Sequence, residues 1–585
     1  MQRLTLRNPN PYHSETYYLL GLLLFYKGQD ALAKDSALAK ELYKEAYEYF
    51  YKAAWSAEQQ EKAYYYLAAL AAREEKWEEA LAHIEKSLIK NAHNVKARGL
   101  KAYLLRKLKR EVEALVCVKD NLALDPFDFV SQSEKEYLGA ASELGTYLEG
   151  NEKNSLILAR DYAEFGAYQE AYDRLFQYAG NIKKPLAWYY MAYFTAAGKL
   201  SDEEDGVLKL LLKAESLPSD YCFPNKLEDI AVLRFAVGQG CKKKAPYYLG
   251  NLFYDKRSFE EAIMLWELSA GEEPGFATVQ RNLAIAYYNK KKDAGAAQMA
   301  LERAFKEDTS DARVFLELDQ LYKKIGKSAK ERLAGYEKYP ELKEFRDDLY
   351  VEYVTLLNED GRYKEALANI LVHHFHPWEG GEGKITRQYE EALLGLAKEN
   401  MKEEKFEEAE ELLKSALVYP ENLGEGKLEG TKDNHIYYHL GLCAMAQGRE
   451  EEAKGFFALA TLGTDEPAGA MYYNDQPAQM ILYQGLAWEK LGEAKRAKAR
   501  FYRLIDYGEK HLRDHVEIDY FAVSLPDFLV FDEDYTVRNK AHCYYLMALG
   551  YLGLGELEKS GNYFREAADT HPAYRADSYG VRLPK

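Results

Sequence analysis

The sequence has little proline and cysteine and no long apolar run. Only 16 of its 585 residues are proline, and none lies between Pro11 and Pro126, so imino-acid chemistry breaks no helix there. Its five cysteines are odd in number and far apart, which excludes the disulfide framework of a small secreted protein. The longest apolar run near the N-terminus, Leu19–Tyr26, is too short to span a membrane and has no leader-like flanks. We therefore expect a reduced, cytoplasmic protein without membrane insertion.

The sequence also lacks an excess of positive charge. Its 78 basic and 95 acidic residues give a net charge of −17, which argues against nucleic acid and anionic membranes as partners. A hydrophobic content of 47% and an aromatic content of 14% exclude a disordered chain. Tyrosine is the abundant residue, with 50 copies.

A repeated spacing of small and large residues predicts the fold. One clear copy contains Leu249-Gly250, Phe253, Ala262, Trp266, Ser269 and Pro274. This spacing resembles the tetratricopeptide repeat, in which small residues let two antiparallel helices approach and large ones fill the gaps. Further copies centre on Ala80, Ala171, Ala366, Ala409, Ala453, Ala497 and Ser560. The sequence thus predicts an all-α, right-handed α-solenoid of tetratricopeptide-like helix pairs, with loop insertions in its C-terminal half.

Glycines and prolines mark the ends of the predicted helices. We expect left-handed caps after the first helix of a pair at Gly28, Gly166, Gly361, Gly448, Gly492 and Gly555. Pro126, Pro274 and Pro572 stand where second helices should stop. The first repeat, marked by Ala46, is lengthened by an insertion around residues 30–40.

Tyrosine pairs recur early in the predicted first helices. They are Tyr17-Tyr18, Tyr64-Tyr65, Tyr189-Tyr190, Tyr247-Tyr248, Tyr437-Tyr438 and Tyr544-Tyr545. Adjacent helical positions point about 100° apart, so one ring of each pair can pack inward while its neighbour faces the concave groove. Two roles are possible for these rings: they pack between helices, or the exposed ones line the groove and bind a ligand.

The repeat lengthens from about residue 350. Ala366, Ala409, Ala453 and Ala497 are 43, 44 and 44 residues apart, against a 34-residue template. We therefore divide the chain into residues 1–345, with partly degenerate repeats, and residues 346–585, with extended repeats. The additional residues follow the second helices, at 376–388, 419–434, 461–478 and, in a longer insert, 506–540.

The first two inserts match each other at an offset of 43. His-Pro-Trp-Glu-Gly-Gly-Glu-Gly-Lys-Ile at 376–385 aligns with Tyr-Pro-Glu-Asn-Leu-Gly-Glu-Gly-Lys-Leu at 419–428. Equivalent positions stack on one edge of a solenoid, so the inserts should build one wall and form a binding face. The candidate ligand-binding residues are Trp378, Glu379, Glu382, Lys384, Glu425, Lys427, Asp433, Asn434 and Tyr438.

Three kinds of chemistry are conceivable for this wall. A phosphate-binding loop fails, because Trp378 and Glu421 stand where its first glycine is needed and Ile385 and Leu428 replace its Ser or Thr. Glu382 and Glu425 could act as a carboxylate pair, as in inverting glycosidases, or could accept N–H bonds from their own loops.

Metal binding is the third chemistry. His435 and His439, like His511 and His515, are four residues apart, yet Ile436 replaces the glutamate of a zinc-protease helix. We predict no metal and no cofactor.

The last insert carries an apolar and acidic stretch, Leu-Pro-Asp-Phe-Leu-Val-Phe-Asp-Glu-Asp at 525–534. It fits a lid or a cap over the solenoid end equally well. Asp532 and Asp534 lack the 12-residue pattern of an EF-hand.

At these inserts the sequence resembles a bacterial tetratricopeptide family whose longer members begin with the β-rich domain of unknown function 5107. The similar stretches are residues 7–13, 376–384, 422–428, 433–434, 483–487 and 525–532. The resemblance implies the solenoid fold and the importance of the loops but no reaction, and it implies that the family's preceding domain is missing from this chain.

These observations lead to two hypotheses. The first is a non-catalytic scaffold that binds a protein or peptide in its concave groove and insert-loop wall. The alternative is a glycan-binding or glycan-cleaving protein in which Glu382 and Glu425 meet beside Trp378, with carbohydrate as ligand. No nucleophile motif of the Gly-x-Ser-x-Gly type appears, and the sequence assigns no reaction.

Overall fold

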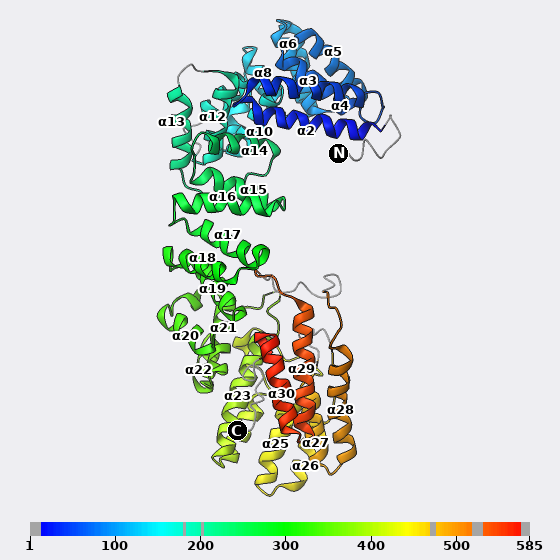
Figure 1. The fold of residues 1–585 in the computed structure, drawn as a ribbon, viewed down its shortest axis with the longest axis vertical. Coiled ribbons are helices and arrows are strands. Elements are labelled where there is room, and N and C mark those ends of the chain that lie inside the picture. Colours follow the sequence, from blue (N-terminus) through cyan, green and yellow to red (C-terminus); the bar gives the residue numbers. More distant parts are fainter. Residues whose placement is uncertain are drawn as a thin grey trace. The chain divides into compact units, whose positions relative to one another are not determined.

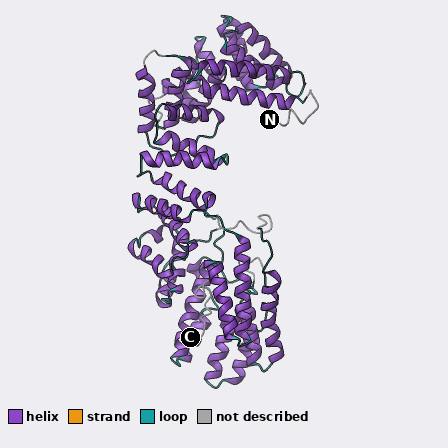
Figure 2. Ribbon diagram, in the orientation of Figure 1, coloured by secondary structure: helices purple, strands orange, loops and turns teal. Residues whose placement is uncertain are grey.

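The computed structural model describes residues 13–178, 183–200, 204–378, 380–468, 476–517 and 530–574. Throughout these ranges the regular structure is helical, and none of the residues in them lies in a β-strand (Figure 2). Successive helices form antiparallel pairs joined by short turns (Figure 1). The prediction of an all-α solenoid of tetratricopeptide-like helix pairs is confirmed.

The chain divides into two compact units, Met1–Val279 and Gln280–Lys585. Unit 1 contains α2 (Ser14–Leu32), α3 (Ser36–Ala53), α4 (Gln60–Arg73), α5 (Trp77–Lys90), α6 (Val95–Lys107), α7 (Glu111–Leu124), α8 (Phe129–Tyr137), α9 (Leu144–Leu148), α10 (Glu152–Glu164), α11 (Tyr168–Tyr178), α12 (Pro185–Gly198), α13 (Glu204–Ser216), α14 (Leu227–Gly238), α15 (Lys244–Asp255) and α16 (Phe259–Glu272). Helix α17 (Ala277–Ala286) carries the boundary.

Unit 2 contains the extended repeats. Its elements are η2 (Tyr287–Lys291), α18 (Ala294–Glu307), α19 (Ala312–Lys324), α20 (Ala329–Lys338), η3 (Leu342–Phe345), α21 (Asp347–Glu359), α22 (Tyr363–Val372), α23 (Lys384–Lys402), α24 (Phe406–Ser415), η4 (Glu421–Leu423), α25 (Asn434–Ala446), α26 (Glu450–Ala460), α27 (Met480–Lys490), α28 (Ala494–His511), α29 (Tyr535–Gly553), α30 (Leu557–Thr570) and η5 (Pro572–Tyr574). The division at residue 345, which rests on repeat length, stays a prediction.

Most of the expected glycine caps are present. Gly166, Gly361, Gly448, Gly492 and Gly555 have φ values between 73° and 83°, the left-handed conformation that ends a helix at low cost to glycine.

The prediction for Gly28 was wrong. Gly28 lies inside α2, where a Cβ would come within 2.5 Å of the Tyr43 ring, so this glycine allows close helix approach. The insertion predicted around residues 30–40 forms no long loop, because α2 ends at Leu32 and α3 begins at Ser36. The additional residues lengthen α2 and α3, which are 19 and 18 residues long.

Small-to-large contacts hold the helix pairs together. A Cβ on Gly441 of α25 would lie 2.5 Å from the Phe457 ring of α26, and a Cβ on Gly485 of α27 would lie 2.2 Å from Phe501 of α28. The two phenylalanines are fully buried. The repeated spacing in the sequence therefore has a physical cause. The small residue of the first helix leaves room for an aromatic ring of the second helix to pack against its backbone.

We expect Gly441→Ala to lower the free energy of unfolding by about 1–3 kcal/mol, because the added methyl overpacks the Phe457 contact. Gly455, on the exposed side of α26, is the matched control, since a Cβ there meets nothing within 4 Å. Gly455→Ala should raise stability by about 0.5–1 kcal/mol through helix propensity. Urea unfolding measures both, and equal effects of the two substitutions would contradict the packing assignment.

Contacts in unit 1 connect helices that lie far apart in the sequence. The Tyr193 hydroxyl of α12 donates to the Gln29 carbonyl of α2 at 2.5 Å, and Arg234 of α14 lies 3.3 Å from Asp30. The guanidinium of Arg73, at the end of α4, donates to the Ala163 carbonyl at 2.6 Å. Early and late repeats of this unit are therefore in direct contact.

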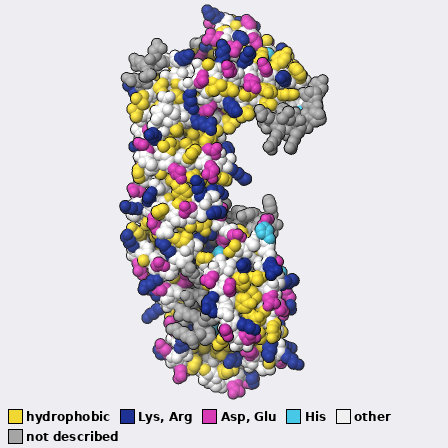
Figure 3. All heavy atoms as spheres, in the orientation of Figure 1, with side chains coloured by type: hydrophobic (Ala, Val, Ile, Leu, Met, Phe, Trp, Pro, Cys, Tyr) yellow, Lys and Arg dark blue, Asp and Glu magenta, His cyan; other side chains and the backbone are white. Residues whose placement is uncertain are grey.

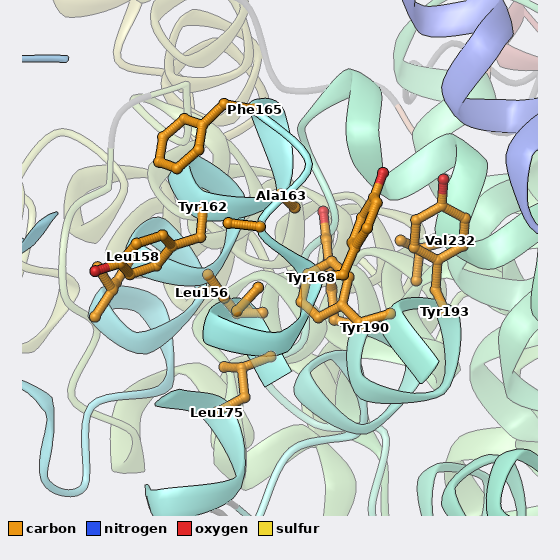
Figure 4. Close-up of a cluster of buried hydrophobic side chains, with 14 of the residues drawn as sticks. Leu156, Leu158, Tyr162, Ala163, Phe165, Tyr168, Leu175, Tyr190, Tyr193 and Val232 are labelled. Atoms are coloured by element: carbon orange, nitrogen blue, oxygen red, sulfur yellow. The ribbon is translucent and has the colours of Figure 1, made fainter. Parts of the chain in front are cut away.

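A dense aromatic core lies where the middle helices of unit 1 meet (Figure 4). Tyr162, Tyr190 and Tyr193 are buried there, and their hydroxyls find partners. Tyr162 donates to Glu134 at 2.7 Å and Tyr190 to Asp229 at 2.6 Å, so each of these buried hydroxyl groups has a carboxylate as hydrogen-bond acceptor.

We expected one ring of each tyrosine pair to pack inward and its neighbour to face the groove, and the structure shows such a difference in burial in only some of the pairs. In three pairs the second ring is buried and the first is half-buried: Tyr64-Tyr65, Tyr247-Tyr248 and Tyr544-Tyr545. Tyr189 and Tyr190 are both fully buried, whereas Tyr437 and Tyr438 are both half-buried. Tyr17 and Tyr18, like Tyr437 and Tyr438, are both half-buried. Packing thus accounts for most of these rings, and the 17–18 and 437–438 pairs leave both rings partly accessible.

The surface carries charges of both signs. In the face drawn in Figure 3, acidic and basic side chains are interspersed with apolar ones, without one dominant basic area. Among the helices that the structure describes, none combines the length and apolarity needed to cross a bilayer.

Candidate functional site

The first two inserts lie side by side in unit 2. The Phe375 amide donates to the Asn422 carbonyl at 2.8 Å, and the Asn422 side chain donates to the carbonyls of Ile370 and His373, both at 2.7 Å. Gly424 is close enough that a Cβ would lie 2.5 Å from the Phe375 carbonyl oxygen. Main-chain contacts between successive repeats therefore build this part of the wall.

Glu382 and Glu425 are engaged by the backbone of these loops. Glu382 accepts from the Gly380 amide at 2.8 Å, and Glu425 reaches across to accept from the Gly383 amide at 2.8 Å. Burial raises the pKa of Glu425, and the nearby charge of Glu382 adds to this, although the Gly383 amide favours the charged form. Both carboxylates therefore stabilise the insert loops by accepting hydrogen bonds from backbone amides. This structural role gives the glycan alternative no support.

Trp378 and Lys384 flank this joint. The half-buried Trp378 ring lies close to Gly381, where a Cβ would come within 2.2 Å of it, and it packs on the buried cluster that includes Tyr389. Lys384 begins α23, with its amide donating to the Gly381 carbonyl at 3.1 Å. Glu379 lies outside the described residues.

Lys427 is the centre of a buried polar cluster. Its ammonium lies 2.8 Å from Asp433 and 3.2 Å from Glu390, and 4.8 Å from the Tyr419 ring centroid. Tyr419 donates to Glu390 at 2.6 Å. Burial raises the pKa of Asp433 to about 6, against the lowering effect of Lys427. Two carboxylates thus share one cation inside the wall.

Asn434 and Tyr438 lie on α25 and have different surroundings. The Asn434 amide donates to the carbonyls of Ala460 and Leu462, both at 2.7 Å, and so closes the C-terminal end of α26. Tyr438 is half-buried, and its ring centroid lies 5.9 Å from that of Tyr483 on α27. Asn434 therefore has a structural role, whereas Tyr438 offers an accessible ring.

The histidine pair on α25 is neutral. Burial lowers the pKa of His435 and His439 to about 3 each, and the charge of Lys398 on α23 adds to this. His439 Nδ1 lies 2.6 Å from the His435 carbonyl oxygen and so donates to it. Within the described residues, no three His, Cys, Asp or Glu side chains are placed to hold a metal ion.

Two carboxylates on neighbouring first helices were missed from the sequence. Burial raises the pKa of Glu391, on α23, to about 7, and it also raises that of Glu359, at the end of α21. The charge of Glu359 adds to the raised pKa of Glu391, whereas Arg387 and Lys398 on α23 oppose that shift. Lys323 on α19 opposes the shift of Glu359. Neither carboxylate forms a hydrogen bond or ion pair with another described residue. The sequence of α23 offers no clear signal for Glu391, because that helix carries several other charged residues.

These groups define the inner face of unit 2. We use that name for Glu359, Glu391, Lys398, His439, Tyr438 and Tyr483, which lie on successive first helices α21, α23, α25 and α27. The charge of Glu359 contributes to the raised pKa of Glu391, and that of Lys398 to the lowered pKa of His439, so charged groups on consecutive first helices lie within electrostatic reach of each other.

No known protein-family profile matches the chain. A tetratricopeptide repeat protein from Parabacteroides merdae is 15% identical with a TM-score of 0.27, over 45% of this chain and 92% of that one. YrrB, a TPR protein with an unusual peptide-binding site, is 14% identical with a TM-score of 0.16, over 40% and 95%. The Cut9–Hcn1 hetero-tetramer structure matches at 14% identity and a TM-score of 0.23, over 96% and 98%. Similarities this distant carry no argument about function, and the fold class rests on the helix pairs themselves.

Proposed function

We propose that the chain is a non-catalytic repeat scaffold that binds a protein or peptide segment on the inner face of unit 2 and the adjoining insert wall. The observation that carries the proposal is the pair Glu359 and Glu391. Both are half-buried carboxylates with raised pKa values, and neither has a hydrogen-bond or ion-pair partner among the described residues.

The free-energy cost of removing water from these two carboxylates indicates which chemical groups a partner would offer them. A half-buried carboxylate that has lost part of its hydration has a raised pKa, and hydrogen-bond donors from a partner would favour its charged form. Peptide main-chain N–H groups, or the basic side chain of a partner, would supply the missing donors. An extended segment with Lys or Arg facing α21 and α23 fits this requirement best.

The predicted wall residues divide into two roles in this proposal. Trp378 and Tyr438 are half-buried aromatic rings that contact the bound segment directly. The other described residues hold the wall in place: Glu382, Lys384, Glu425, Lys427, Asp433 and Asn434. Glu379, outside the described residues, is given no role. No metal, cofactor or catalytic step is part of the proposal.

A peptide array tests this function. Nonapeptides with fixed Lys or Arg positions are screened against the full chain, and the tightest binder is then measured by calorimetry. We expect Glu359→Gln, Glu391→Gln to weaken binding at least about tenfold, as loss of desolvated charge-assisted bonds does. Glu399→Gln is the matched control, because Glu399 lies on the exposed side of α23.

The pH dependence supplies a second readout. The pKa of Glu391 is about 7, so its carboxylate is charged above that pH and protonated below it. Binding of a basic peptide should therefore weaken as pH falls from 8 to 6, and Glu391→Gln should remove that dependence. Equal affinities for wild type, the double variant and Glu399→Gln would overturn the proposed site.

A further inference from the structure

Residues 530–533, which we call the strap, contact elements of unit 2 that lie far away in sequence. The Asn289 side chain of η2 donates to the Val530 carbonyl at 2.9 Å and accepts from the Asp532 amide at 2.8 Å. Asn289 is almost fully buried by this contact. One amide side chain thus pairs with both main-chain groups that flank residue 531, and such pairing is independent of side-chain identity.

Phe531 anchors the strap. It is 1% exposed, and its ring centroid lies 5.1 Å from that of Tyr288, with the two planes at 73°. An edge-to-face aromatic contact with nearly complete burial is typical of the residue that dominates a peptide's affinity.

Charge complements this anchor. The Asp532 carboxylate lies 3.9 Å from Lys290 and 3.7 Å from Lys292. Glu533 lies 3.6 Å from Lys324 of α19 and 3.2 Å from His571. The surface that receives the strap is therefore basic where the strap is acidic.

The local backbone shapes this surface. Residues Tyr287–Lys291 form a π-helical turn, a rare form that is frequently found at functional sites. Lys292 ends the turn with φ 55°, a left-handed conformation that costs a non-glycine residue energy. We call Tyr288, Asn289, Lys290, Lys292 and Lys324 the dock.

We propose that the dock is a peptide-binding site that the strap occupies in cis, and that it accepts in trans an extended segment with an aromatic residue followed by two acidic residues. All its contacts are made to four consecutive residues, so a separate chain with this pattern can satisfy the same partners. The site lies on η2 and α19 and is distinct from the inner face, so the two proposals stand or fall separately.

The tethered strap competes strongly with a free peptide. Attachment to the same chain gives it an effective concentration in the millimolar range. A peptide should therefore bind weakly to the wild type and more tightly once the strap has lost its anchor.

The test uses a fluorescent peptide of sequence Val-Phe-Asp-Glu-Asp, which repeats residues 530–534, and the full chain. We expect Phe531→Ala to bind it at least about tenfold more tightly than wild type. Adding Asn289→Ala to that variant should abolish the gain, and a peptide with alanine in place of phenylalanine should not bind. Circular dichroism checks that each variant is folded.

Asp532→Lys provides a second way to loosen the strap if Phe531→Ala does not fold, because Asp532 is half-exposed. The expected gain is then about threefold, consistent with a surface ion pair. Unchanged peptide binding in both strap variants, or binding that survives Asn289→Ala, would overturn the proposal. Strap exchange between two copies, seen as a wild-type dimer that the peptide cannot dissociate, would also overturn it.

Discussion

The Arg332→Ala variant is expected to lose about 3–5 kcal/mol of unfolding free energy, the cost of leaving buried carboxylates without their cation. Arg332 of α20 donates to both oxygens of Asp319, at 2.9 and 2.7 Å, and to Glu352 at 2.6 Å. The Arg332 and Asp319 side chains are each 3% exposed, so water cannot replace the lost bonds. Urea unfolding measures the change.

The arginine geometry makes a second comparison informative. Lysine cannot form the two parallel bonds to Asp319, so Arg332→Lys should recover only part of the loss. Lys330→Ala, on the exposed side of the same helix, is the control and should leave the unfolding midpoint unchanged. A midpoint for Arg332→Ala equal to that of Lys330→Ala would contradict the assignment.

The pH dependence of this loss has a definite sign. Burial disfavours the charged form of Glu352, but Lys323 and Arg332 outweigh it and hold its pKa below the ordinary value. A depressed carboxyl pKa contributes stability that is present at neutral pH and lost as pH falls. The difference between Arg332→Ala and wild type should therefore shrink on acidification below about pH 4.5.

Replacing Lys427 by methionine is expected to have a comparable effect, about 3–5 kcal/mol at pH 8, because two buried carboxylates lose their shared cation. The side chains of Lys427, Glu390 and Asp433 are 15%, 14% and 7% exposed. Thermal unfolding of the full chain measures the change. Lys454→Met is the control, since Lys454 pairs with the exposed Glu451 on α26.

Acid should partly rescue this variant. The pKa of Asp433 is already raised to about 6, and without Lys427 it should rise further. A raised carboxyl pKa contributes stability at low pH that is lost as pH rises through the folded-state value. Lys427→Met should therefore be less damaging at pH 5 than at pH 8. Equal losses at the two pH values would show that packing, not charge, is the main role of Lys427.

The helix pairs could be predicted because their determinants are local. Gly441, Phe457 and the caps at Gly361 and Gly448 belong to the pattern of one repeat, and the structure places them as that pattern requires. Gly28 was assigned wrongly because a helical glycine and a cap glycine cannot be told apart without knowing that Tyr43 lies against it.

The candidate site was predictable only in part. The matching inserts identified a joint between repeats, yet the sequence could not decide whether Glu382 and Glu425 face a ligand or their own loop amides. Glu391 was missed because its burial depends on how α23 packs against other helices, including α21. The docking of Asn289 on residues 530 and 532 joins positions more than 240 residues apart, which no repeat period encodes.

Binding on the inner face is tested most directly by site-specific photo-crosslinking. Benzoylphenylalanine replaces Tyr438 on the inner face in one variant and Tyr502, 52% exposed on the second helix α28, in another. The tightest basic nonapeptide from the array is added and irradiated. We expect a crosslinked adduct from position 438 and none from position 502. An adduct from position 502 alone, or equal yields from both, would contradict binding on the inner face.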